Sequence, residues 1–183
     1  SKKGKISMKE AIFAGGCFWC TEAVFMNIKG VEKVISGYIG GNVDDPNYEI
    51  ICSGKSGHYE AIKILYDPLI ISYGKLLEIF FATHDPTQIN GQGNDIGSQY
   101  LSAIFFFDEY QKKEANNYID IVSKNHIEPI ITKLFSVKKF YPAEDYHQNY
   151  YNLNQSQPYC EIVINPKMTK FREEYKHLLK TGS

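Results

Sequence analysis

The pattern of apolar and polar positions divides the chain into short strands and helices. Five runs that are continuously apolar or that alternate predict strands, at residues 10–14, 31–38, 60–66, 100–107 and 128–135. Four stretches with helical spacing predict helices, at residues 18–28, 72–84, 108–123 and 167–179. Ser72 and Asp108 are the expected N-caps of the second and third helices.

Other segments lack such a pattern. Residues 48–52 are too few to assign to a helix or a strand, and residues 155–158 are typical of an exposed connection. Residues 85–98 are polar and glycine-rich without periodicity, and loops of that length in a compact domain are usually functional or disordered. Residues 140–151 are dense in aromatic and ionisable groups.

Strands that alternate with helices predict a mixed α/β (α+β) fold. We expect a two-layer sandwich around a mixed sheet, with a βαβ unit at the N-terminus as in a ferredoxin-like core. The pattern does not fix the strand order. We expect a leader or expression remnant at residues 1–8, a catalytic domain at 9–165, and a C-terminal helical extension and tail at 166–183. The chain could also be one module of a longer polypeptide.

Composition narrows the function classes. The 183 residues are 43% hydrophobic and 22% charged, which suits one compact domain. A formal net charge of −1 gives no support for nucleic acid or an anionic membrane as partner. No apolar segment approaches the length of about 20 residues that spans a bilayer, and no hydrophobic region follows the basic residues 1–5. We therefore expect a cytoplasmic protein.

Four cysteines, Cys17, Cys20, Cys52 and Cys160, are too few for a disulfide framework in a chain this long. Their spacing matches no common zinc pattern, so we expect no metal and no cofactor. A Cys-x-x-Cys pair in a protein that is not secreted is more often redox-active or catalytic. We expect Cys52 to pack inside the protein.

Cys17 is the candidate nucleophile. Gly15-Gly16 ends the first strand in a turn, so Cys17 falls in the first turn of the next helix. Unpaired amides and the helix dipole favour a thiolate there, and such placements move a cysteine pKa from about 8.5 to roughly 3.5–7.5. The plainer alternative is a small buried core residue. From the pattern alone the chain performs thiol-dependent chemistry with unassigned partner residues.

Longer motifs carry a resemblance. In chain order they are Gly16-Cys17-Phe18-Trp19 with Glu22 and Phe25, Gly37-Tyr38-Ile39-Gly40-Gly41, Tyr48, Cys52-Ser53-Gly54, Gly57-His58-Tyr59-Glu60-Ala61, Tyr66-Asp67-Pro68, His84-Asp85-Pro86-Thr87-Gln88, Gln92-Gly93-Asn94-Asp95, Gln99-Tyr100 and Phe140-Tyr141-Pro142-Ala143-Glu144-Asp145-Tyr146-His147-Gln148. This series, over about residues 10–165, resembles the A-type methionine sulfoxide reductases, which reduce one epimer of the sulfoxide.

The resemblance implies roles for single residues. Cys17 matches the nucleophile that attacks the sulfoxide sulfur and becomes a sulfenic acid. Glu60 matches the residue that protonates or polarises the sulfoxide oxygen, and burial could keep it protonated near neutral pH.

Five further residues match the substrate site. Tyr48 and Tyr100 match two phenols that hydrogen-bond the sulfoxide oxygen, and Asp95 matches a carboxylate of the same polar cluster. Phe18 and Trp19 match the apolar wall that accepts the methyl group. A sulfoxide of the other epimer would place its oxygen against this wall, which selects the S epimer.

The sulfenic acid must then be resolved by a second thiol. Cys160 corresponds to the family position, and we favour it as the first resolving thiol because we expect flexible surroundings. Cys20 replaces a glycine common in the family and is the competing resolver, or one step of a relay. The resemblance implies that thioredoxin, or a similar dithiol, reduces the final disulfide.

Two other functions stay open. A thioredoxin-like disulfide oxidoreductase would use Cys17 and Cys20 and leave Tyr48, Glu60 and Tyr100 without a role. A redox-regulated protein would bind oxidised methionine without turnover. The sequence does not indicate the preferred substrate proteins, the choice between free and peptide-bound sulfoxide, or the oligomeric state.

Overall fold

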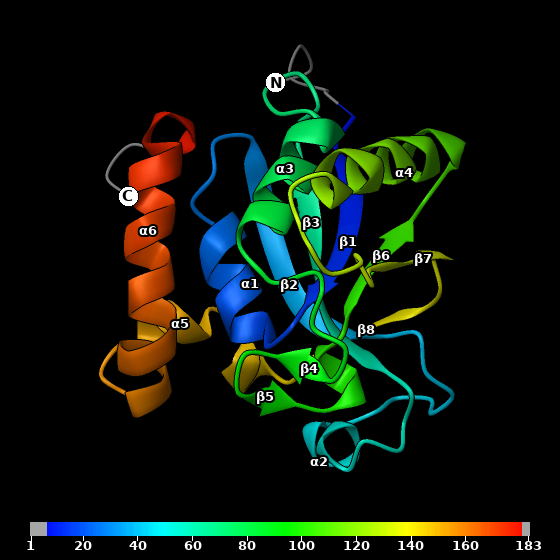
Figure 1. Cartoon of the computed structure of the whole chain (residues 1–183). Coiled ribbons are helices and arrows are strands. Elements are labelled where there is room, and N and C mark those ends of the chain that lie inside the picture. The colour runs from blue at the N-terminus through cyan, green and yellow to red at the C-terminus, as the bar shows by residue number, and fades with distance from the viewer. Residues whose placement is uncertain (1–6, 181–183) are drawn as a thin grey trace.

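A six-stranded mixed sheet, in the order β7-β6-β1-β3-β2-β8, forms the centre of the computed structural model, which describes residues 7–180 (Figure 1). The β6–β7 pair is parallel and the other pairs are antiparallel. The strands are β1 (Lys9–Gly15), β2 (Val31–Ile39), β3 (Tyr59–Tyr66), β6 (Ser102–Phe106), β7 (Lys133–Ser136) and β8 (Phe140–Pro142). A separate hairpin pairs β4 (Gly91–Gln92) with β5 (Asp95–Ile96).

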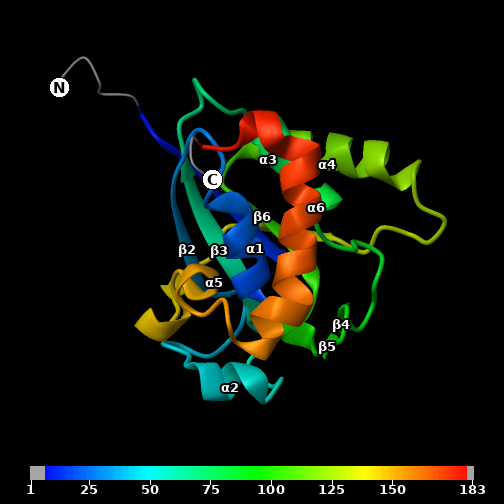
Figure 2. The ribbon, with the colours of Figure 1, turned by 90° about the vertical axis from the view of Figure 1, so that its left-hand side faces the viewer.

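Helices cover one face of the sheet, and α1 and α6 lie on that side in Figure 2. The α-helices are α1 (Phe18–Phe25), α2 (Tyr48–Cys52), α3 (Tyr73–Ala82), α4 (Glu109–Ser123), α5 (Tyr150–Leu153) and α6 (Asn165–Tyr175). Shorter helical turns are η2 (Ser98–Tyr100), η3 (Asp145–His147), the π-helical η4 (Cys160–Ile164) and η5 (Lys176–Leu178). The predicted mixed α+β class is confirmed.

The alternation of side chains along β1 explains the two layers. Ala11 and Phe13 belong to the large core between the sheet and the helices, whereas Ile12 and Ala14 belong to a small cluster on the other face. Phe13 stacks on Phe80 of α3 with ring centroids 4.8 Å apart. Burying aromatic rings of this size supplies much of the stabilisation of such a core.

The strand register brings distant parts of the chain together. β1 and β2 both run antiparallel to β3, which lies between them, so they point the same way without pairing. Gly15, at the end of β1, pairs with Ser102 at the start of β6, and Glu60, near the start of β3, pairs with Tyr38 near the end of β2. β1 and β2 therefore end, and β3 and β6 therefore begin, at the same end of the sheet.

The turn between β1 and α1 requires glycine. Gly16 has φ +101°, a conformation that other residues adopt at a cost, and a Cβ there would lie 2.7 Å from Gln92 Cγ. The Gln92 side chain is itself held by two hydrogen bonds to the backbone of Asp85. After this turn Cys17 is the N-cap of α1, and its carbonyl accepts the backbone N–H of Cys20 at 3.0 Å.

Several predicted elements need correction. Residues 85–98 are not structureless, because they contain the hairpin of β4 and β5, whose strands of two residues are too short to show periodicity. The predicted strand 128–135 is reduced to Lys133–Ser136, and the predicted helix 18–28 ends at Phe25. Cys52 is exposed and does not pack inside, because it ends the short surface helix α2.

The C-terminal helix begins earlier than predicted. Helical structure starts at Pro158, continues through the π-helical η4 and passes into α6, so Pro166 lies within a continuous helical segment, just after the π-helical residues. Ile164, Met168 and Phe171 belong to the main core cluster, so residues on both sides of the predicted boundary at 165/166 share one core. Of the predicted leader at residues 1–8, residues 1–6 lie outside the described residues.

Within residues 7–180, none of the helices has the length and apolar character needed to cross a membrane.

We predict that Gly16→Ala lowers the free energy of unfolding more than the control Gly54→Ala. Both glycines have positive φ, and a Cβ in that conformation costs about 1–2 kcal/mol. Only Gly16 adds a steric clash, since a Cβ at Gly54 would meet no atom within 4 Å. Urea unfolding of both variants measures the difference, and equal losses would show that the approach of Gln92 does not constrain the turn.

Candidate active site

Cys17 and Glu60 lie close together at the end of the sheet where β1 ends and β3 begins. Cys17 is half-buried at the start of α1, and Glu60 is only 1% exposed. The backbone N–H of Phe18 donates a hydrogen bond of 3.1 Å to Glu60 Oε1. The carboxyl group therefore lies directly beneath the first helical turn that carries the thiol.

The Glu60 carboxyl is protonated at neutral pH. Burial, with smaller contributions from the negative charges of Asp95 and Cys20, raises the pKa of Glu60 to about 8, although the hydrogen bond from Phe18 acts in the opposite direction. The direction is the one predicted from the sequence. A carboxylic acid with such a pKa can donate a proton at pH 7.

The thiol of Cys17 does not behave as predicted. Burial raises the pKa of Cys17 well above its ordinary value, and the hydrogen bond with Cys20 and the charge of Glu60 add to this effect. The backbone N–H of Trp19 lowers it by less. The expectation of a resting thiolate at Cys17 is wrong, because burial and neighbouring acidic groups outweigh the helix terminus.

Cys20 is the thiol with the lower pKa. The hydrogen bond from Cys17, together with Lys167 and Tyr159, lowers the pKa of Cys20 to about 7, against the effects of burial and of the Asp95 charge. Cys160 is fully buried, and burial raises its pKa. The structure therefore places Cys160 within the core and not in flexible surroundings.

The two predicted phenols are neutral donors. Burial raises the pKa of Tyr48, with the nearby Cys52 thiol adding to the effect. Burial also raises the pKa of Tyr100, as do the charges of Glu60 and Cys17, so this phenol belongs to the same polar cluster. Both hydroxyl groups keep their protons at neutral pH.

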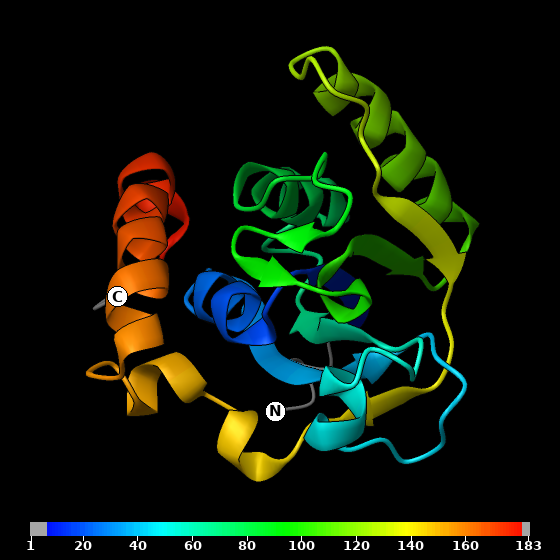
Figure 3. The ribbon, with the colours of Figure 1, turned by 60° about the horizontal axis from the view of Figure 1, so that its bottom comes forward.

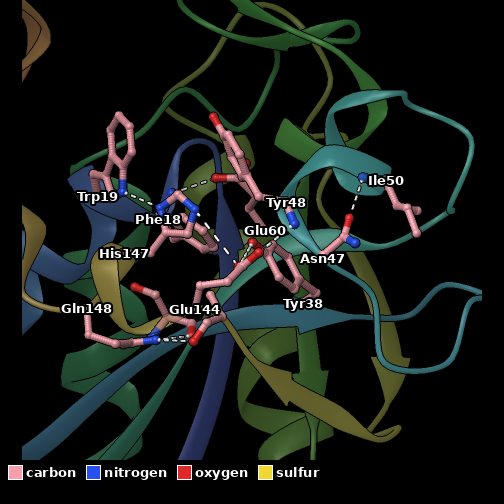
Figure 4. Close-up of polar contacts among 12 residues, drawn as sticks. Phe18, Trp19, Tyr38, Asn47, Tyr48, Ile50, Glu60, Glu144, His147 and Gln148 are labelled. Carbon is pink, nitrogen blue, oxygen red and sulfur yellow. Dashed lines mark hydrogen bonds and ion pairs between the residues drawn. The ribbon is translucent and has the colours of Figure 1, made fainter.

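Glu144 fixes the segment that carries Tyr48. Its Oε2 accepts the backbone N–H of Tyr48 at 2.8 Å, and its Oε1 accepts the hydroxyl of Tyr38 at 2.8 Å. Asn47 caps α2 by accepting the backbone N–H of Ile50 (Figure 4). These hydrogen bonds hold the start of α2 against the end of β2.

The Trp19 indole is held from three sides. Its Nε1–H donates to His147 Nδ1 at 3.1 Å, and Figure 4 shows Trp19, His147 and Glu144 in succession. The ring stacks on Tyr150 at 3.8 Å between centroids and meets the edge of Tyr159 at 5.6 Å. Burial lowers the pKa of His147, so its ring remains a neutral acceptor. The indole is a rigid, partly exposed surface.

The two predicted wall residues differ in exposure. Phe18 is 1% exposed and packs on Tyr38 and His147, so it lies behind the surface that Trp19 presents. The signal for this difference is absent from the sequence, because both residues are aromatic and adjacent.

Asp95 is held by a residue that sequence reasoning left unassigned. The hydroxyl of Tyr159 donates to Asp95 Oδ2 at 2.7 Å and lies 3.6 Å from Cys20 Sγ. A cavity of about 350 Å³ is lined by Cys17, Cys20, Asp95, Tyr159 and Lys167, among others. The hairpin of β4 and β5, which carries Asp95, lies beside the start of α1 in Figure 3.

Across residues 7–180, no group of three or more histidine, cysteine or acidic side chains is arranged to hold a metal ion.

Comparison with known proteins places this site in a family. The sequence model described as "Peptide methionine sulfoxide reductase" matches residues 9–179. The chain belongs to this family. Reduction of methionine sulfoxide is therefore its activity, and the reductase is an oxidoreductase.

Curated relatives and solved structures agree. "Peptide methionine sulfoxide reductase MsrA" of Chromobacterium violaceum is 53% identical over 175 residues, which cover 94% of this chain and 99% of that protein. The Deinococcus radiodurans protein of the same name is 49% identical, over 95% of this chain and 85% of that protein. Reduced Mxr1 from Saccharomyces cerevisiae superposes with a TM-score of 0.79 at 30% identity, covering 86% of this reductase and 94% of that chain.

The structure brings most of the predicted site together. The pKa values of Cys17, Glu60 and Tyr100 depend on charges within one cluster, which also contains Asp95 and Cys20. Two residues of the C-terminal segment that the sequence reasoning did not assign to the site also line its cavity. Tyr159 directly precedes Cys160, and Lys167 lies on α6, so their positions depend on how that helix packs.

We predict a directly observable protonated Glu60. Infrared difference spectra between the reductase and Glu60→Gln should contain the C=O band of a carboxylic acid at about pH 6. Because the folded pKa of Glu60 is raised, the band should disappear as pH rises, with a midpoint of about 8. Glu22, whose pKa burial raises to about 7, provides the control through Glu22→Gln. A Glu60 midpoint near the ordinary value of about 4.3 would contradict the assignment.

Proposed function

We propose that this reductase acts on methionine S-sulfoxide, free or in proteins, with Cys17 as nucleophile and Glu60 as acid. The observation that supports this most is the protonated Glu60 carboxyl, which is buried and hydrogen-bonded beneath the turn that carries Cys17. At pH 7 the Glu60 carboxyl and the Cys17 thiol are both protonated and lie close together, so both protons are available when a sulfoxide binds.

The first step transfers an oxygen atom between two sulfur atoms. Cys17 Sγ attacks the sulfoxide sulfur while Glu60 protonates the sulfoxide oxygen, which is otherwise a poor leaving group. A bond forms between Cys17 Sγ and the substrate sulfur. The protonated oxygen then passes to Cys17 Sγ as this S–S bond and the substrate S–O bond break, so Cys17 becomes a sulfenic acid and methionine leaves. The thiol proton of Cys17 restores Glu60. The substrate sulfur gains two electrons and the Cys17 sulfur loses two.

The neutral phenols of Tyr48 and Tyr100 support this assignment, because each keeps a proton to donate to the sulfoxide oxygen. The Trp19 indole supplies the apolar surface for the methyl group, with Phe18 packed behind it. In the R epimer the oxygen would face the indole and the phenols would lack an acceptor. Unpaired buried polar groups make such a complex unfavourable.

We propose that Cys20, and not Cys160, resolves the sulfenic acid first. Cys20 follows Cys17 by one helical turn, and in the reduced protein the Cys17 thiol, Lys167 and Tyr159 lower the pKa of Cys20 to about 7. Cys160 is fully buried with a raised pKa. Cys160 then attacks Cys20 in a second exchange, which moves the disulfide away from Cys17. The first turn of α1 must loosen for the bond between Cys17 and Cys20 to form.

A thioredoxin-like dithiol reduces the final disulfide in this scheme, by two thiol–disulfide exchanges that oxidise the dithiol. A complex of yeast Mxr1 with Trx2 has a related fold, with a TM-score of 0.57 at 24% identity. We propose that the reductase acts in the cytoplasm, where such dithiols keep thiols reduced.

We also propose that the core is ferredoxin-like. The four strands β1, β2, β3 and β6 lie in the order β6-β1-β3-β2, all antiparallel, with α1 and α3 in the two crossovers. This order and direction of strands supports the split βαβ arrangement. The catalytic domain at residues 9–165 then contains this core, and the described residues 166–180 extend it.

We predict that mass spectrometry after one equivalent of methionine S-sulfoxide maps the order of the thiols. Cys160→Ser should form methionine once and stop with Cys17 joined to Cys20. Cys20→Ser should accumulate the Cys17 sulfenic acid, trapped by dimedone. Cys17→Ser should form no methionine. Direct joining of Cys17 to Cys160 in Cys20→Ser, at the wild-type rate, would return Cys160 to the first position.

We predict that the reductase forms methionine from the S-sulfoxide with dithiothreitol and reduces insulin disulfides slowly by comparison. Tyr48, Glu60 and Tyr100 serve only the first reaction, so Glu60→Gln should slow sulfoxide reduction by about 10²–10⁴-fold and leave insulin reduction unchanged. Activity on insulin alone would favour a disulfide oxidoreductase.

A further inference from the structure

One phenol oxygen connects the resolving thiol with a carboxylate. Tyr159 Oη lies 2.7 Å from Asp95 Oδ2 and 3.6 Å from Cys20 Sγ. These three groups come from segments far apart in the sequence, namely α1, β5 and the residue before η4. The Trp19 ring packs against Tyr159 at an interplanar angle of 75° and fixes the phenol between the thiol and the carboxylate.

The hydrogen bonds that link Cys20, Tyr159 and Asp95 have a defined direction. A carboxylate only accepts, so the single hydroxyl proton of Tyr159 points to Asp95. The phenol oxygen is then left to accept the S–H of Cys20. Protonated sulfur, phenol and carboxylate thus form an ordered path from Cys20 to Asp95.

We propose that Tyr159 is a catalytic residue of the resolving step, which passes the proton of Cys20 to Asp95 while Cys20 attacks the Cys17 sulfenic acid. This proposal rests on the proposed function, in which Cys20 is the first resolving thiol. Asp95 acts through Tyr159 and is a positioning residue for this step.

The step balances in atoms and electrons. The Cys20 S–H proton moves to Tyr159 as the Tyr159 hydroxyl proton moves to Asp95. Cys20 Sγ forms a bond to Cys17 Sγ, and the S–O bond of the sulfenic acid breaks. The departing hydroxyl takes the proton of Glu60 and leaves as water, and the proton on Asp95 replaces that of Glu60 through solvent. The Cys20 sulfur is oxidised and the Cys17 sulfur is reduced.

The surroundings of Cys20 favour its ionised form during attack. Lys167 of α6 lines the same cavity and lowers the pKa of Cys20, and the phenol lowers it as well once it has taken the Cys20 proton and donates to the thiolate. The charge of Asp95 acts in the opposite direction. Other titratable groups coupled to Cys20 are Cys17, Glu60 and Cys160. When Asp95 takes up the proton during the step, it loses the negative charge that raises the pKa of Cys20.

Tyr159→Phe in the Cys160→Ser enzyme tests the relay, because the ring that packs on Trp19 remains while the hydroxyl is lost. Acid-quenched samples after one equivalent of methionine S-sulfoxide give the rates of methionine formation and of Cys17–Cys20 bonding across the pH range. We expect bonding to be about tenfold slower at neutral pH, since the thiolate fraction falls as the Cys20 pKa returns toward about 8.5. This deficit should close with rising pH, and methionine formation should change much less.

Two further variants complete the test. Asp95→Asn keeps a hydrogen-bond acceptor for Tyr159 but cannot hold the proton, so bonding should slow at neutral pH as in Tyr159→Phe. Tyr118→Phe removes a phenol that stacks on Phe81, outside the site, and should resolve at the parent rate.

Two results would overturn the proposal. If Tyr159→Phe matches the parent rate of bonding at every pH, the relay is wrong while Cys20 remains the resolving thiol. If the Cys160→Ser parent itself forms no bond between Cys17 and Cys20, the proposed order of the thiols fails and the relay fails with it.

Discussion

The burial of one carboxyl group beneath the start of a helix is the constraint on which the site depends. Glu60 accepts the backbone N–H of Phe18 at 3.1 Å, and this bond joins the second residue of β3 to the first turn of α1. Gly15 and Gly16 carry no side chains, which lets the turn between them lie against Phe80, His84 and Gln92. The same bond keeps an acid next to the Cys17 thiol and withdraws it from water.

Burial divides the chemistry between two thiols. It raises the pKa of Glu60 and of Cys17 together, so the pair that meets the sulfoxide is neutral and holds the protons that the reaction moves. The more acidic thiol is Cys20, one helical turn away, where Lys167 and Tyr159 stabilise negative charge. Oxygen transfer thus belongs to a neutral site, and disulfide formation to an adjacent site that favours a thiolate.

Local pattern predicted the strand, glycine turn and helix that place Cys17, because apolar periodicity and paired glycines are short-range signals. The direction of the Cys17 pKa shift could not be predicted from the local pattern, since it depends on burial and on Glu60, 43 residues further along the chain. The exposure of Cys52 and the early start of the last helical segment at Pro158 were missed for the same reason. Tertiary packing decides these features.

The pH dependence of methionine formation in a single turnover tests the central claim most directly. The claim is that the site works through a protonated Glu60 and not through a resting Cys17 thiolate. We predict that the rate falls as pH rises through about 8, the pKa of Glu60, and that Glu60→Gln is slow without this fall. A rate that instead increases through this range, following ionisation of Cys17, would contradict the account.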